Sequence, residues 1–380
     1  IFLDLRKAFD TCNIDIMLKK LHHYGFRDIP LKWFKNYLTG RKQYVEINGV
    51  KSKEKFISHG VPQGSILGPI LFLIYINDFP SATSLFSSLF ADDTMLTKSS
   101  NDIKQLQDIS NIELEKVSSW FKANKLSLNI SKTKYMIFRN DKMPKISNNF
   151  ELLIDNTKLE RVGKDFETKS FKFVGVHLDE FFNWDYHINH VNNKISSAIY
   201  AINQVKKILS SDTLKTIYNS LFKPHIEYAI ITWGLSNHKD IELLRLKQKK
   251  AFRIVSKSTY NAHCDPLLSK LNVLKFDDIL NVNVAGFISK FHNNKLPPSF
   301  GDVFQSFNSQ RVKNLKAKSP KLKSLNYFPT AAIPRIWNRF SLNVKNCKSY
   351  KLAKSKYKKG KIQSYSSFRC NKRKCYPCKT

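Results

Sequence analysis

Two short apolar runs carry acidic residues where a strand would normally hold further apolar side chains. Asp4 lies within Phe2–Leu5, and Asp92 and Asp93 directly follow Leu89–Ala91. A carboxylate enclosed by apolar strand residues is costly unless a positive charge accompanies it. Mg²⁺ would relieve that cost, because it prefers oxygen ligands and is often held by one or two carboxylates together with substrate phosphates. A strand carrying one Asp beside a hairpin carrying two would be a suitable scaffold for two such ions.

Each feature taken alone has an ordinary structural explanation. A single Asp is typical of a surface or a turn, and an Asp-Asp pair is typical of a turn or a helix N-cap. The segment between them, Gly60–Pro69, holds Pro62, Gln63 and Gly64 ahead of an apolar helix predicted over 64–77. Pro62 fixes a bend and the glycines allow close approach of the backbone, but an ordinary loop has the same composition.

Charge indicates the class of partner. The 380 residues include 64 Lys and Arg against 30 Asp and Glu, a net charge of +34, and 42% of the residues are hydrophobic. This apolar content excludes a wholly disordered chain, and the charge favours a polyanion, with nucleic acid ahead of an anionic membrane. The longest apolar run, Ile70–Ile76, is far shorter than the roughly 20 residues that span a bilayer, so no membrane partner is expected.

Three regions differ in pattern, and together they predict an α+β fold. Residues 1–180 alternate strand and helix patterns, residues 181–302 are mainly helical, and residues 303–380 form a basic C-terminal region with no acidic residue after Asp302. From Lys348 onward the spacing predicts a flexible segment. The more detailed predictions are a hairpin over 44–49, a helix over 102–124, and strands over 135–138 and 171–176.

The cysteines leave one question open. Six cysteines in 380 residues are too sparse for a disulfide framework, which favours a reducing, intracellular compartment. Cys375 and Cys378 have the spacing of a zinc-binding pair, with Cys370 close by. A structural zinc would need a fourth ligand from elsewhere. The alternative is free thiols in a basic tail.

The order of the segments resembles that of reverse transcriptases. Asp4–Asp10, Gly60–Pro69 and Phe90–Asp93 are similar to the family's motifs A, B and C, especially in the non-LTR (LINE-type) branch that includes jockey and CR1-like elements. Leu126–Thr133 and Phe173–Asp179 resemble motifs D and E. Further similarity to this branch continues downstream at Leu221–Tyr228, Thr232–Gly234, Gln248–Arg253 and Ile336–Asn338.

The resemblance implies a fold and a catalytic group. Residues 1–180 would form the palm, an antiparallel sheet with packed helices, and residues 181–302 a thumb-like helical region. Asp4 and Asp92 would coordinate two Mg²⁺ ions, and Asp93 would complete the metal-binding cluster. Lys132 would neutralise or protonate the pyrophosphate leaving group.

The resemblance also implies binding residues. Leu5, Phe9, Gln63 and Gly64 would line the nucleotide and template pocket, and the Phe9 ring would exclude a ribose 2′-hydroxyl. Val174 and Gly175 would belong to the primer grip.

The implied function is an RNA-directed DNA polymerase of a non-LTR retrotransposon, acting in the nucleus or cytoplasm of a eukaryotic host. Its partners would be an RNA template, a DNA primer and deoxynucleoside triphosphates. The alternative is an inactive nucleic-acid-binding remnant of such an element. Because the sequence starts at Ile1, we expect a fragment without the family's fingers region and therefore weak or absent activity.

Overall fold

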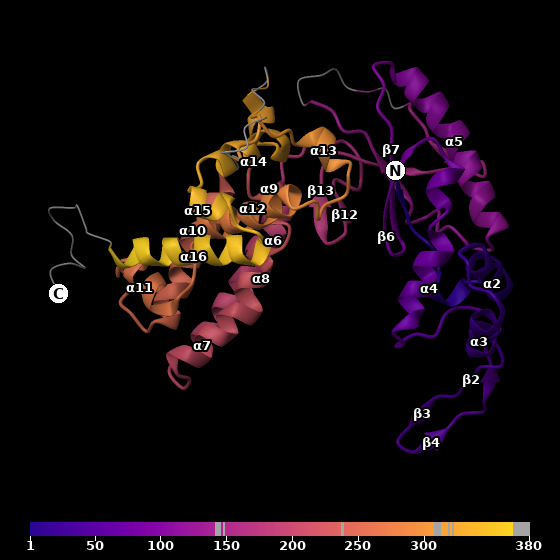
Figure 1. Ribbon diagram of the computed structural model, residues 1–380, viewed down its shortest axis with the longest axis horizontal. Helices are drawn as coiled ribbons and strands as arrows, with labels where there is room; N and C mark the ends of the chain where they lie inside the picture. Colours follow the sequence, from indigo (N-terminus) through magenta and orange to yellow (C-terminus); the bar gives the residue numbers. More distant parts are fainter. Residues whose placement is uncertain are drawn as a thin grey trace. The chain divides into compact units, whose positions relative to one another are not determined.

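The computed structural model describes residues 1–140, 146, 149–236, 239–307, 313–317, 320 and 323–367. The chain forms two compact units, Ile1–Phe182 and Asn183–Thr380 (Figure 1). The first unit combines sheets with helices and the second is helical, which confirms the α+β class. Cys370, Cys375 and Cys378, the predicted zinc ligands, lie outside the described residues.

A five-stranded sheet organises the first unit, with strand order β11-β8-β1-β7-β6. The central strand β1 is antiparallel to both of its neighbours, whereas β11 runs parallel to β8. Both residues of β1 are apolar and buried because helices or other strands cover each face of a central strand. The strand bounds are β1 (Phe2–Leu3), β6 (Phe86–Phe90), β7 (Asp93–Thr97), β8 (Lys134–Met136) and β11 (Glu160–Val162).

Helices pack against the side of the sheet that Leu3 faces. The long helix α5 (Ile103–Ala123) buries Leu114, Val117 and Phe121 at helical spacing, which confirms the helix predicted over 102–124. The apolar helix predicted over 64–77 is α4, which is shorter. The helices of this unit are α1 (Ala8–Thr11), α2 (Ile14–His23), α3 (Asp28–Leu38), α4 (Leu67–Ile76) and α5, with a 3₁₀ turn at Phe79–Ala82.

Short two-stranded ribbons complete the first unit. The predicted hairpin over 44–49 is confirmed as β3 and β4, joined by Asn48 and Gly49, which both have positive φ (49° and 81°). That combination is the turn favoured between antiparallel strands. The ribbon strands are β2 (Lys42–Gln43) with β5 (Lys55–Phe56), β3 (Glu46–Ile47) with β4 (Val50–Lys51), β9 (Leu153–Ile154) with β10 (Thr157–Lys158), and β12 (Phe171–Phe173) with β13 (Val176–Leu178).

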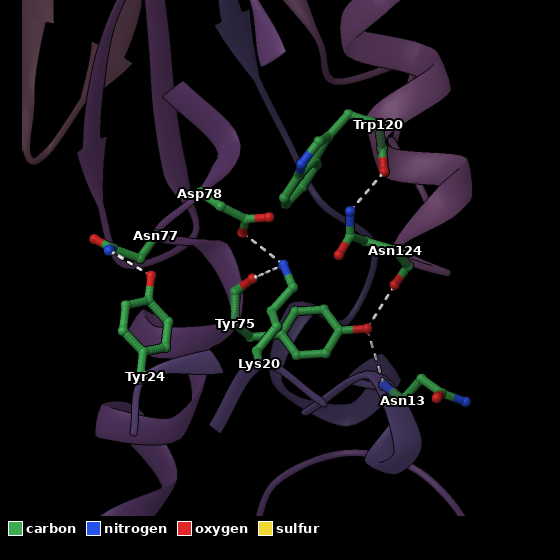
Figure 2. A network of polar contacts seen from close by, with 8 residues as sticks. All are labelled: Asn13, Lys20, Tyr24, Tyr75, Asn77, Asp78, Trp120 and Asn124. Carbon is green, nitrogen blue, oxygen red and sulfur yellow. Dashed lines mark hydrogen bonds and ion pairs between the residues drawn. The ribbon is translucent and has the colours of Figure 1, made fainter. Parts of the chain in front are cut away.

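A polar network joins α2, α4 and the end of α5 (Figure 2). The Tyr75 hydroxyl donates to the Asn124 carbonyl (2.6 Å) and accepts from the Asn13 N–H (3.3 Å). Burial raises the pKa of Tyr75 to about 12. The Lys20 ammonium donates to the Tyr75 carbonyl and to Asp78, both at 2.6 Å. The network joins the residues just after α1 to the residues just after α5. Along the chain, the first segment follows Asp4, and the second is followed by the residues that bond the Asp4 backbone.

The second unit encloses a large apolar core. Trp233, Trp337 and Phe222 are fully buried in it, and α6 contributes the predicted stripe that includes Ile188 and Ile195. Its helices are α6 (Asp185–Val205), α7 (Ser211–Ile217), α8 (Lys223–Glu227), α9 (Ile230–Trp233), α10 (Asp240–Val255), α11 (Cys264–Leu271), α12 (Phe276–His292), α13 (Phe300–Val303), α14 (Pro329–Asn338), α15 (Leu342–Lys345) and α16 (Tyr350–Ser366), with a π-helical turn at Tyr218–Phe222 and a 3₁₀ turn at Lys323–Tyr327.

The prediction of a flexible segment from Lys348 onward is wrong as far as Ser366. Helix α16 occupies this region and packs against α12. The reason lies in three buried groups: Asp278 of α12, 3% exposed, accepts hydrogen bonds from the hydroxyls of Tyr357 and Tyr365. Tyr357 and Tyr365 attach α16 to the core, and Lys361 also pairs with Asp278 (3.5 Å). Other lysines of the helix, Lys351, Lys356 and Lys359, are exposed.

Candidate active site

The sheet brings the predicted carboxylates together. Strand β1 pairs with β7 so that Leu3 lies opposite Thr94, and Asp4 and Asp93 are the next residues along the two strands. Asp92 occupies the two-residue turn between β6 and β7, next to Ala91, whose φ is +54°. Residues almost ninety positions apart in the sequence therefore meet at one end of the two strands.

The charges of these carboxylates influence one another. The pKa of Asp93 is raised, first by partial burial and then by the negative charges of Asp92 and Asp4. A nearby cation would relieve this repulsion. The site thus has the electrostatics expected of a cluster that binds a positive ion.

A second segment holds the backbone of Asp4 from the opposite side. The Asn129 N–H donates to the Asp4 carbonyl (2.8 Å), and the Asp4 N–H donates to the Thr133 hydroxyl (3.2 Å). One residue further along, Leu5 forms a β-bridge with Leu128. The segment predicted to resemble motif D therefore fixes the position of Asp4.

Lys132 and Asp4 line the same hollow, which has a volume of about 450 Å³. Arg6 and Lys7 also line it, so three cations and one carboxylate share the hollow. Cations beside a carboxylate can hold the phosphates of a nucleotide while the carboxylate faces a metal ion. Leu5 lines the hollow too, but it is only 8% exposed and packs in the core of the unit.

Gln63 is held by a residue that sequence reasoning missed. Its amide Nε2 donates to Asp10 Oδ1 over 2.6 Å. Two backbone hydrogen bonds join the same two segments of the chain. The Val61 N–H donates to the Phe9 carbonyl (2.9 Å), and the Gly60 N–H donates to the Cys12 carbonyl (2.7 Å). Asp10 belongs to the segment that resembles motif A. Its polar side chain at the surface of α1 was the feature that could have identified it as a contact residue.

The remaining predicted residues have varied surroundings. Phe9 is partly buried and its ring packs against Phe72, with centroids 4.5 Å apart, whereas Gly64 is exposed with φ +78°. Val174 and Gly175 form the turn of the β12–β13 ribbon, and both have positive φ (42° and 77°). A β-branched residue in this region is strained, which marks Val174 as an unusual position.

The prediction that Asp4, Asp92 and Asp93 bind Mg²⁺ can be compared with the arrangement of their side chains. Among the residues that the structure describes, no group of three or more His, Cys, Asp or Glu side chains is arranged to hold a metal ion. The chemistry of the three carboxylates and the raised pKa of Asp93 fit a hard divalent cation. The residues therefore suit the ion chemically, while their side chains do not converge as ligands.

Carboxylates at the ends of adjacent central strands, beside a hollow lined with cations, are the elements of a site for phosphoryl transfer. Residues 1–178 match the family described as "Reverse transcriptase (RNA-dependent DNA polymerase)". The motifs of residues 1–178 predicted this match, and the activity that defines the matched family is that of an RNA-directed DNA polymerase.

Relatives extend the similarity past the matched domain. The chain is 26% identical to the "RNA-directed DNA polymerase from mobile element jockey" of Drosophila funebris over 325 residues, covering 82% of this chain and 34% of the relative. It is 24% identical to the "Probable RNA-directed DNA polymerase from transposon X-element" of Drosophila melanogaster over 339 residues, 84% of this chain and 35% of the relative. It is 23% identical to the "Probable RNA-directed DNA polymerase from transposon BS" of the same species over 287 residues, 72% of this chain and 30% of the relative.

These relatives confirm the branch named from the motifs, the non-LTR retrotransposons. The chain spans about a third of the length of these relatives. No helix among the described residues is long and apolar enough to cross a membrane.

Proposed function

We propose that this chain carries the polymerase site of a non-LTR retrotransposon and adds deoxynucleotides to a primer 3′-hydroxyl on an RNA template. The observation that carries the proposal is the pairing of β1 with β7, which aligns Asp4 with Asp93 next to the hollow that Lys132 lines. In this assignment residues 1–180 are the palm and residues 181–302 are thumb-like. Residues 303–380 supply a further basic region.

Asp4, Asp92 and Asp93 would hold two Mg²⁺ ions. When bound, such ions stabilise the attacking and leaving oxygens of an in-line displacement. The protein's own contribution is positioning and charge neutralisation, because phosphoryl transfer asks for little covalent chemistry from the enzyme.

Side chains around the carboxylates divide the remaining work. Lys132, with Arg6 and Lys7 in the same hollow, neutralises the phosphates and can donate a proton to the departing pyrophosphate. Phe9, supported by Phe72, excludes a ribose 2′-hydroxyl. Gln63, held by Asp10, and Gly64 contact the nucleotide and template, and Leu5 contributes its backbone.

The proposed partners follow from the reaction and the charge. The basic helices of residues 185–300 hold the template–primer duplex through its phosphates, and Val174 and Gly175 contact the primer. Such a protein works where chromosomal DNA and element RNA are present, in the nucleus or cytoplasm of a eukaryotic host. The second candidate function is an inactive nucleic-acid-binding remnant, favoured by side chains that do not converge as metal ligands.

Primer extension on an RNA template with Mg²⁺ and deoxynucleotides tests the proposal. We would compare the 380-residue chain with the same chain fused to a family-like fingers segment before Ile1, each with and without Asp92→Asn. We expect Asp92→Asn to reduce extension at least ~100-fold, because each ion contributes several kcal/mol to the transition state. Asp108→Asn, an exposed position on α5, is the matched control and should leave extension unchanged.

The outcomes separate the two functions. Extension that depends on Asp92 in either chain supports the polymerase. No extension in both chains, with salt-sensitive nucleic-acid binding intact and a related active enzyme working in the same assay, supports the remnant instead.

A further inference from the structure

A basic hollow of about 560 Å³ lies in the second unit, remote in sequence from the candidate active site. It is formed by the end of α6, the last turns of α10 and the loop that follows α10. Five of its lining residues are cationic and none is acidic. The cations are Lys206, Lys207, Lys250, Arg253 and Lys257.

These cations differ from other basic residues of the same unit. Among the ion pairs of the described residues, none involves any of the five. Arg245, which lies two turns before Arg253 on α10, instead pairs with Asp277 (2.7 Å) and Glu242 (3.0 Å). Like charges gathered without counter-charges repel one another and attract an anion. The hollow is therefore electrostatically suited to phosphate groups.

Tyr260 adds an aromatic surface to this charge. It lines the hollow and is 87% exposed. Arg253 lies over its ring, 6.0 Å from the centroid, and donates from Nε to the Ala262 carbonyl (2.9 Å). Because the Arg253 guanidinium is hydrogen-bonded to the backbone of the loop, it limits where the Tyr260 ring can lie. The ring itself remains exposed to solvent.

We propose that this hollow binds an unpaired stretch of a nucleic-acid strand, with phosphates on the lysines and a base stacked on Tyr260. Cationic grooves with exposed aromatic rings bind single strands in this way, independent of sequence. A base inside a duplex has both faces covered by its neighbours, so a duplex would gain nothing from the ring. The inference rests on the proposed function for its choice of nucleic acid, but the site lies outside the catalytic residues.

Fluorescence anisotropy with a labelled oligouridine RNA and a matched RNA duplex tests the role of Tyr260. The full chain is used with EDTA and without nucleotides, at a salt concentration that suppresses diffuse binding. We expect Tyr260→Ala to weaken single-strand binding at least about fivefold, the lower end of one stacked base, and duplex binding less than twofold. Tyr260→Phe keeps the ring and should bind normally. Tyr200→Ala removes another exposed ring, outside the hollow and on α6, and should have no effect.

Charge is tested separately through the salt dependence. Lys206→Gln and Lys257→Gln together should reduce the slope of log K against log salt by about 0.7 for each phosphate that the variant no longer neutralises. Lys104→Gln is the matched control, because Lys104 is exposed on α5, outside the hollow and outside the helices assigned to the duplex.

Equal losses for single strand and duplex after Tyr260→Ala, or no loss for either, would overturn the proposal in favour of a diffuse basic surface. Far-ultraviolet circular dichroism and thermal melting of each variant identify any that fail to fold. In such a case ultraviolet crosslinking of the RNA to the native chain decides, with attachment at Tyr260 expected and attachment only elsewhere contradicting the site. The assay contains neither Mg²⁺ nor nucleotides, so its result is independent of polymerase activity.

Discussion

Gly60 lies where the segment that holds Gln63 crosses the segment that holds Phe9 and Asp10. A Cβ atom added at Gly60 would come within 2.7 Å of the Asp10 carbonyl oxygen, and its φ of +81° already favours glycine. Only a residue without a side chain allows the two backbones to approach this closely. The contact between Gln63 and Asp10 depends on that approach.

Gly60→Ala is expected to destabilise the first unit by about 3 kcal/mol, the sum of a left-handed backbone penalty and a close contact with rigid backbone. Urea unfolding followed by circular dichroism measures the change. Gly40→Ala is the control, because Gly40 also has positive φ (+69°) but no atom lies within 4 Å of its added Cβ. Equal losses for both variants would mean that the crossing is not tightly packed.

At the residue scale, the sequence indicated which side chains could carry chemistry better than it indicated which side chains contact one another. The prediction that Asp4, Asp92 and Asp93 share an acidic site came from the resemblance of their segments to known motifs. The regular spacing of residues along β1 and β7 places Asp4 and Asp93 next to each other. The hydrogen bond from Gln63 to Asp10 was not predictable, since it joins two surface residues through a backbone crossing that no local pattern encodes.

Helix α16 shows the same limit at the scale of elements. Ala353, Tyr357 and Tyr365 are buried and lie at multiples of four residues, which is helical spacing. Surrounding lysines weaken the apolar periodicity, so the segment resembled a flexible tail. Its order depends on a partner, Asp278 of α12, about eighty residues earlier. Elements with strong local patterns, such as α5 and the β3–β4 hairpin, were predicted correctly.

Asp278→Asn is expected to loosen α16. The substitution keeps the size of the side chain but removes the charge that accepts hydrogen bonds from Tyr357 and Tyr365, and bonds to charged groups contribute about 1.5–3 kcal/mol each. Hydrogen exchange should therefore accelerate in residues 350–366 while α5 is unaffected. Asp302→Asn, at an exposed site, is the control. Unchanged protection of α16 would mean that apolar packing alone holds it.

For the whole molecule, pH should act through a half-buried histidine, His292, as well as through net charge. Burial, followed by the charge of Lys313, lowers the pKa of His292 to about 4. His292 also packs against Trp337, with ring centroids 5.5 Å apart. The unfolded chain protonates this histidine near pH 6.5, so between about 6.5 and 4 it binds more protons than the folded chain.

Stability is therefore expected to fall as the pH is lowered through this window, and the contribution of His292 to be fully favourable above it. His292→Phe removes the titrating group and keeps a ring beside Trp337. The difference in free energy of unfolding between the native chain and the variant, measured by urea at several pH values, should shift in favour of the variant below pH 6.5. A difference that stays constant with pH would show that His292 is accessible to protons in the folded state.

Because β1 lies between two later strands of the sheet, it cannot complete its pairing until both have been synthesised. Phe2 pairs with Met95 and with Lys134, so the strand leaves the ribosome long before either neighbour. At typical rates of synthesis the delay is on the order of ten seconds, during which an unpaired apolar strand can pair with other chains. The Asp4 backbone gains its supports only when Asn129 and Thr133 have been translated. A translation product interrupted before these residues would carry the carboxylate without the surroundings that make it a site.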